Sequence, residues 1–218
     1  PSSVDSFEAA RRRLALEPFL RLQSRVAARR RAWLESRALA CPVDDRGHAR
    51  ILGFLPFVPT PGQARIASEL RADLARAVPM RRLLQGDVGS GKTALGLYAC
   101  LAVASAGGQA AFLAPTELLA EQHFDGSRSL LERAGMHAVL LTGSLSASER
   151  RAALAQLESG MADLAFGTHA LFSDGVRYRE LALAVIDEQQ RFGVAQRARL
   201  LDKGPEKGKD VHALLMTA

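Results

Sequence analysis

The chain has 218 residues, of which 48% are hydrophobic and 24% charged, a globular composition that excludes a disordered, collagen-like or disulfide-stabilised protein. Its two cysteines, Cys41 and Cys100, lie far apart, and no Cys/His group has metal-ligand spacing. Since the first residues also contain no apolar targeting segment, we expect a reduced, cytoplasmic protein without zinc.

The net charge of +6 is concentrated near the start of the chain. Residues 1–50 carry 11 Arg against 6 acidic residues, whereas residues 51–218 carry 18 basic against 17 acidic residues. A basic segment of this kind is typical of a surface that faces nucleic acid or an acidic partner, but also of a solvated helix face. The charge alone leaves both interpretations open.

Residues 6–40 have a helical pattern in which Pro18 predicts a break between a short helix and a longer one. Apolar residues recur there at spacings of three, four and seven: Phe19, Leu22, Val26 and Trp33. One helix cannot bury such a stripe alone, so we expect it to pack on a neighbouring domain. Turn-forming residues at 42–53 predict a loop and a boundary near residue 50. We therefore expect a basic helical linker at 1–50 and one α/β domain at 51–218.

Beyond residue 50, short apolar runs alternate with helix-length segments. The runs predict strands at 82–85, 110–114, 138–141, 164–166, 182–186 and 213–216. Helices are expected at 92–106, 117–134 and 147–160, the last after a capping box that begins at Ser146. Continuously apolar strands that alternate with helices predict a parallel sheet covered on both faces. Residues 93–116 are uncharged over a membrane-spanning length, but glycines interrupt them, so we expect a helix followed by a buried strand and no membrane span.

The first predicted strand is followed by a glycine-rich loop that matches G-x-x-x-x-G-K-T and opens a helix. Its residues are Gly86, Asp87, Val88, Gly89, Ser90, Gly91, Lys92 and Thr93. Glycines let backbone N–H groups surround a polyphosphate, Lys92 can reach the β- and γ-phosphates, and the Thr93 hydroxyl can bind Mg²⁺. Part of this loop also fits the dinucleotide pattern G-x-G-x-x-A, but the acidic residue that this pattern needs does not end the second strand. We therefore predict a site for ATP and Mg²⁺.

An acidic pair, Asp187 and Glu188, ends a buried strand downstream. A P-loop ATPase holds magnesium and activates water at such a place, with Asp187 supporting the metal and Glu188 polarising the water. By itself the pair also fits the N-cap of a following helix. Together with the P-loop, it predicts Lys92, Asp187 and Glu188 as catalytic residues.

These motifs, with four further segments, resemble the RecG family of superfamily 2 DNA helicases over about residues 54–218. The segments are 57-FVPTPGQ-63, 114-APTELLAEQH-123, 167-GTHA-170 and 216-MTA-218, and the acidic pair extends to 187-DEQQRFGV-194. The resemblance implies a RecA-like P-loop NTPase lobe with a mainly parallel sheet, truncated at its C-terminal end. It implies an ATP-dependent helicase that remodels branched DNA at stalled replication forks and recombination intermediates. It further implies a monomeric protein with a second RecA-like lobe and an N-terminal fork-binding domain.

The resemblance also suggests roles for single residues. Gln63 matches the residue that recognises adenine. Contacts with the DNA backbone are implied for Pro115, Thr116, Glu117, Thr142, Gly143, Gly167, Thr168 and His169. Small or hydroxylated residues at strand ends suit phosphate contact, although Thr116 also fits a helix cap and His169 an ordinary loop residue. Thr217 and Ala218 match the start of the motif that couples hydrolysis to movement.

Gln190 departs from the family pattern, because most relatives have a histidine there. An amide can form a hydrogen bond but cannot become cationic, so the way in which ATP hydrolysis is coupled to movement stays open. Three alternatives remain. The motor lobe of a transcription-repair coupling translocase is similar, although Ser90 and Gln189 fit RecG better. A P-loop kinase or transport ATPase and a non-catalytic binding module are other classes, and the lobe in isolation is expected to have little activity.

Overall fold

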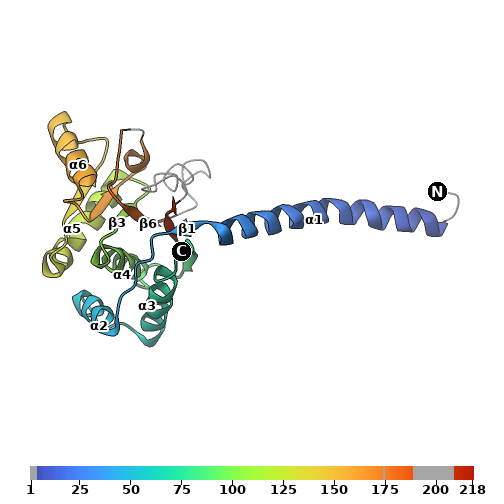
Figure 1. Ribbon diagram of the computed structural model, residues 1–218, viewed down its shortest axis with the longest axis horizontal. Coiled ribbons are helices and arrows are strands. Elements are labelled where there is room, and N and C mark those ends of the chain that lie inside the picture. Colours follow the sequence, from blue (N-terminus) through green and yellow to red (C-terminus); the bar gives the residue numbers. More distant parts are fainter. Residues whose placement is uncertain (1–3, 174, 189–208) are drawn as a thin grey trace. The chain divides into compact units, whose positions relative to one another are not determined.

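The structure, a computed structural model, describes residues 4–173, 175–188 and 209–218. It divides into two compact units, Pro1–Ser36 and Arg37–Ala218. The first unit contains helix α1 (Val4–Glu35), drawn in blue in Figure 1. The predicted break at Pro18 is wrong, since α1 continues through it; Ala, Leu and Arg, all strong helix formers, surround the proline and offset the loss of one backbone donor. Phe19, Leu22 and Val26 of the expected apolar stripe are exposed.

The second unit begins after Ser36, not near residue 50 as the turn-forming residues suggested. The loop predicted at 42–53 is also wrong, because α2 (Asp45–Phe54) lies there. The side chain of Asp44 caps this helix by accepting a hydrogen bond from Gly47 N at 2.7 Å. Ile51 on its inner face is 1% exposed, so packing offsets the low helix propensity of two glycines.

The centre of this unit is a six-stranded parallel sheet with the order β2-β8-β6-β3-β5-β4. Its strands are β2 (Arg81–Gln85), β3 (Gln109–Leu113), β4 (Ala138–Leu141), β5 (Leu164–Gly167), β6 (Leu181–Ile186) and β8 (His212–Thr217). All six strands were predicted to within one residue at each end. A separate short pair joins β1 (Arg37–Ala38) to β7 (Lys209–Asp210).

Helices cover both faces of the sheet. They are α3 (Pro61–Leu74), α4 (Lys92–Ser105), α5 (Glu117–Ala134), α6 (Ala147–Ser159) and the short 3-10 helix η1 (His169–Phe172). Phe112 of β3 belongs to the core under α3, α4 and α5, whereas its neighbour Leu113 belongs to the core under α6 and η1. Figure 1 shows β3 and β6 between α4 and α6. The predicted fold class, a RecA-like lobe with a mainly parallel sheet, is confirmed.

The uncharged segment 93–116 consists of buried helix α4 followed by buried strand β3. None of the helices in the described ranges combines the length and the apolar character that a bilayer crossing requires. Because the six strands are parallel, their carboxyl ends lie at one edge of the sheet, which is where ligands bind in open α/β folds.

Candidate functional site

The glycine-rich loop connects the end of β2 to the start of α4, as the sequence predicts. Gly89 and Gly91 have φ angles of 79° and 86°, in the left-handed region that glycine adopts without strain. A Cβ atom at Gly91 would lie 2.5 Å from Gln63 Nε2, so a side chain at this position would also displace the amide of Gln63. The loop conformation therefore depends on its glycines.

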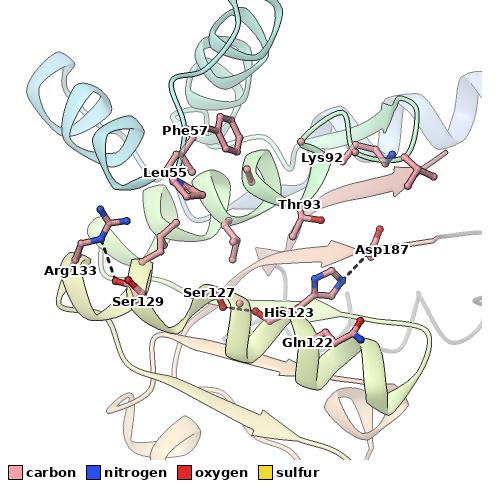
Figure 2. Close-up of a pocket in the computed structure, with 18 of the residues that line it drawn as sticks. Leu55, Phe57, Lys92, Thr93, Gln122, His123, Ser127, Ser129, Arg133 and Asp187 are labelled. Carbon is pink, nitrogen blue, oxygen red and sulfur yellow. Dashed lines mark hydrogen bonds and ion pairs between the residues drawn. The ribbon is translucent and has the colours of Figure 1, made fainter.

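A pocket of about 520 Å³ opens beside this loop. Lys92 and Thr93 line it from α4, and Asp187 and Glu188 line it from the end of β6, so two motifs far apart in sequence share one cavity (Figure 2). Its apolar part is formed by α4, α5 and the segment before α3, and includes Leu55, Phe57, Leu97 and Leu130. A cavity that combines an apolar wall with a few polar groups is typical of a small-molecule site.

The Lys92 side chain is hydrogen-bonded to the backbone of the glycine-rich loop. Its ammonium Nζ donates hydrogen bonds to the carbonyl oxygens of Gly86 and Asp87, the second at 2.8 Å. These bonds hold the positive charge against the backbone at the start of the glycine-rich loop. To contact a phosphate, the ammonium group has to exchange carbonyl oxygens for phosphate oxygens.

The acidic pair follows directly from β6. Asp187 N donates to Leu113 O at 2.9 Å, which extends the pairing with β3 by one residue. Its Oδ1 atom accepts a hydrogen bond from Glu188 N at 3.0 Å, and Glu188 has a φ of 49°, a strained value for a residue other than glycine. Such strain is found mainly at functional sites. The alternative role of the pair as a helix cap falls on residues outside the described ranges.

The oxygen donors in this pocket fit a magnesium ion. Mg²⁺ prefers oxygen ligands and is usually held by one or two protein groups together with substrate phosphates and water. The Thr93 hydroxyl and the Asp187 carboxylate line the same pocket, and no group of three or more His, Cys, Asp or Glu residues within the described ranges forms an all-protein metal cage. This donor set suits Mg²⁺ bound together with a polyphosphate.

Gln63 lies at the third position of α3 and belongs to a capping box with Thr60. Its Oε1 accepts a hydrogen bond from Thr60 N, and its Nε2 donates to Ser90 O, each at 2.9 Å. The side chain therefore joins the start of α3 to the glycine-rich loop. Its role in adenine recognition stays a prediction.

The residues expected to contact DNA lie at or just after the carboxyl ends of β3, β4 and β5, which are neighbours in the sheet. Thr116 is exposed and caps α5 by accepting a hydrogen bond from Leu119 N at 3.3 Å, so the cap interpretation describes one of its contacts. Glu117 is half-buried, and its Oε1 accepts a hydrogen bond from Gly143 N at 2.8 Å. Pro115 beside them is also half-buried.

The remaining members of this set differ in accessibility. Gly143 and His169 are exposed, whereas Thr142, Gly167 and Thr168 are buried. A Cβ atom at Gly167 would lie 2.2 Å from Leu141 O, so this glycine permits the close approach of β4. The Thr168 hydroxyl has no hydrogen-bond partner among the described residues.

The expected coupling residues are only partly described. Thr217 ends β8 and lies opposite Gln85 of β2 in the sheet register, and its carbonyl oxygen accepts a hydrogen bond from Gly86 N at 3.3 Å. The segment that precedes Ala218 is therefore in direct contact with the start of the glycine-rich loop. Gln190 lies outside the described residues.

The structure adds residues that the motifs did not single out. His123 of α5 lies in the pocket, with its Nε2 atom 3.0 Å from Asp187 Oδ2 (Figure 2). Arg133 lines the opposite end and donates a hydrogen bond to Phe54 O. His123 closes the sequence segment 114–123, but nothing in that segment shows that its side chain faces Asp187.

Comparison with known proteins identifies the family. Residues 60–218 match the DEAD/DEAH box helicase family. The ATP-dependent DNA helicase RecG of Treponema pallidum (strain Nichols) is 49% identical over 167 residues, which cover 75% of this chain and 24% of that protein. The RecG protein of Escherichia coli (strain K12) is 42% identical over 209 residues, covering 96% of this chain and 30% of that protein.

Solved structures agree with this result. The structure of RecG bound to a three-way DNA junction has a TM-score of 0.78 and 36% identity, covering 99% of this chain and 28% of that chain. A DEAD box protein from Methanococcus jannaschii, at 21% identity and a TM-score of 0.59, shows a similar fold. This chain spans less than a third of the length of the RecG proteins named here. The resemblance to RecG is confirmed, and the chain belongs to the DEAD/DEAH box helicase family.

Proposed function

We propose that this chain is the ATP-binding lobe of an ATP-dependent DNA helicase that acts on branched DNA. One observation carries the proposal: the glycine-rich loop and the acidic pair line one pocket, and α5 forms another wall of it. The segment that resembles DNA-contacting residues lies at the start of this helix. DNA would thus contact the start of α5, and the nucleotide would contact the part of the same helix that begins at Gln122.

At the nucleotide, each residue has a distinct role. Bound ATP with Mg²⁺ supplies the phosphoanhydride bond to be cleaved and a divalent charge that stabilises the departing phosphate. Lys92 neutralises phosphate oxygens, and Thr93 and Asp187 hold the metal. Glu188 accepts a proton from the attacking water. Gln63 and the apolar wall beside Phe57 receive the base.

At the DNA, the exposed strand ends contact phosphates without reading sequence. Thr116 offers a hydroxyl, Gly143 a backbone segment and His169 an imidazole. A solved RecG structure holds a three-way DNA junction, and we extend branched DNA as the substrate to this chain on the basis of their 36% identity. We further propose a monomeric, cytoplasmic protein in which a second RecA-like lobe and a fork-binding domain complete the machinery, with coupling through Thr217 and the segment that contains Gln190.

The direct test is ATP hydrolysis by the whole protein of which we propose this lobe to be a part, measured with no DNA, with linear duplex and with a three-way junction. We expect the junction to stimulate hydrolysis most, and Lys92→Ala to abolish the stimulated rate. Hydrolysis that no DNA stimulates would contradict the proposal and favour a kinase or transport ATPase. Stimulation that requires RNA polymerase would favour the transcription-repair translocase.

A further inference from the structure

His123 is held in one orientation beside the expected metal ligand. Its imidazole ring packs against Phe112 of β3, with ring centroids 5.0 Å apart and the planes inclined by 54°. Its carbonyl oxygen accepts a hydrogen bond of 2.6 Å from the buried Ser127 hydroxyl one turn later. Both the backbone and the ring of His123 are therefore held by buried neighbours.

The side chain of His123 points at Asp187. The two atoms His123 Nε2 and Asp187 Oδ2 are 3.0 Å apart, and the side chains are 15% and 14% exposed. An ionised carboxylate can only accept hydrogen bonds, so the tautomer that fits this contact has its proton on Nε2, and Nε2–H is the hydrogen-bond donor. The other oxygen, Oδ1, accepts from Glu188 N, so each carboxylate oxygen of Asp187 has a protein donor.

These contacts leave the carboxylate able to bind metal. An ionised carboxylate has about four lone-pair sites on its two oxygens, and the two donors use two of them. Asp187 and Thr93 line the same pocket, so the remaining sites are available to a metal ion or to its bound water. Partners that orient a metal-binding carboxylate typically change metal affinity by roughly 10–100-fold.

We propose that His123 is a positioning residue for magnesium: it orients the Asp187 carboxylate, which together with Thr93 would hold the metal. This inference rests on the proposed function, because it assumes the Mg²⁺–nucleotide site. It assigns to α5 a role at the nucleotide in addition to the expected DNA contacts at its start. Neither the glycine-rich loop nor the acidic pair contains this residue.

The test compares three substitutions at one position. His123→Leu introduces an apolar side chain of similar size and removes the hydrogen-bond donor. Glutamine places an amide nitrogen near the position of Nε2, whereas the shorter asparagine places it near Nδ1, out of reach of Asp187. His137→Leu is the matched control, because His137 is an exposed histidine outside the pocket lining.

The measurement is the binding of a fluorescent ADP analogue to the chain at increasing Mg²⁺ concentrations and in EDTA. We expect His123→Leu and His123→Asn to raise the half-saturating Mg²⁺ concentration by roughly 10–100-fold. His123→Gln and His137→Leu should stay near the unsubstituted protein. Binding of the analogue in EDTA should be the same in all variants, because the phosphate contacts of the loop do not involve His123.

Two results would overturn the inference. One is an unchanged half-saturating Mg²⁺ concentration in His123→Leu, or in His123→Asn if the leucine variant does not fold. The other is a loss of analogue binding in EDTA that is as large as the loss with Mg²⁺, which would indicate that His123 has only a structural role. If the unsubstituted protein does not bind the analogue at all, the proposed function itself fails, and this result is visible before any substitution is made.

Discussion

Glu117 and Gly143 join two strand ends: the carboxylate at the start of α5 accepts a hydrogen bond of 2.8 Å from the backbone N–H in the turn after β4. Both residues belong to the set expected to contact DNA, yet a carboxylate repels phosphate. The hydrogen bond joins the Glu117 side chain to the turn that contains Gly143, and we infer that Glu117 holds this turn in place. A Cβ atom at Gly143 would lie 2.8 Å from the same carboxylate oxygen, so a larger residue there would displace the carboxylate.

This contact predicts opposite effects of two substitutions at Glu117. Glu117→Ala releases the turn and should weaken DNA binding several-fold, although it removes a negative charge. Glu117→Gln keeps a carbonyl acceptor for Gly143 N and should bind DNA at least as tightly as the unsubstituted protein. Fluorescence anisotropy with a labelled junction measures both, with Glu132→Ala at the far end of α5 as a charge-matched control. Tighter binding by Glu117→Ala would show that Glu117 acts only through its charge.

Lys92→Ala should weaken Mg²⁺-ADP binding by about 1.5–3 kcal/mol, the usual contribution of a hydrogen bond to a charged group. The loss is reduced by whatever the carbonyl contacts with Gly86 and Asp87 contribute before binding. Calorimetry on the chain provides the measurement, and Arg65→Ala, an exposed cation on α3, serves as the control. Equal affinities for Lys92→Ala and the unsubstituted chain would refute the phosphate assignment.

Glu188→Gln should separate binding from turnover. An amide cannot accept a proton from water, so hydrolysis should fall by roughly 10²–10⁴-fold while nucleotide affinity stays unchanged. The measurement uses the whole protein, with the second lobe proposed above, under DNA-stimulated conditions, together with nucleotide binding on the same sample. A variant that keeps more than half the activity would mean that the strained backbone at Glu188 serves the fold and not proton transfer.

The buried environment of His212 predicts that the folded protein loses stability in mild acid. It is fully buried, its Nδ1 accepts a hydrogen bond from Met80 N, and its Nε2–H donates to Leu39 O, each at 2.8 Å. Burial lowers the pKa of His212 below its usual 6.5, with the nearby Arg81 acting in the same direction against the bond to Leu39 and the charge of Asp73. The folded state thus resists protonation that the unfolded chain accepts.

Stability from this histidine is therefore present above pH 6.5 and lost as the pH falls from there toward the lowered pKa of the folded state. Urea unfolding between pH 5 and 8 should show this slope, and His212→Gln should reduce it while lowering stability at pH 8 by about 1–3 kcal/mol, because Met80 N then lacks its acceptor. Burial also lowers the pKa of His48, so His48→Gln is the control for the slope that remains. An identical slope in His212→Gln would contradict the assignment.

Local sequence patterns were sufficient to predict the six strands of the sheet, the helices α4, α5 and α6, and the glycine-rich loop. Continuous apolar runs, capping residues and glycines are each read from a few neighbouring positions, so their physical basis is already present in the sequence. The same local signals failed between residues 37 and 54. There, glycines and aspartates suggested a loop, whereas burial of Ile51 stabilises α2.

The neighbours in the sheet were decided only by the tertiary structure. An apolar run predicts that a strand is buried but not which strand lies beside it, and the order β2-β8-β6-β3 differs from the order in the chain. This order brings Thr217 against Gly86 and Asp187 into the pocket of Thr93. Thr142 and Thr168, which directly follow β4 and β5, are buried. Likewise, the contact of His123 with Asp187 arises because α5 packs against β4 and β5 with His123 directed toward the end of β6. Such long-range contacts depend on how complete elements pack, and no short stretch of sequence encodes them.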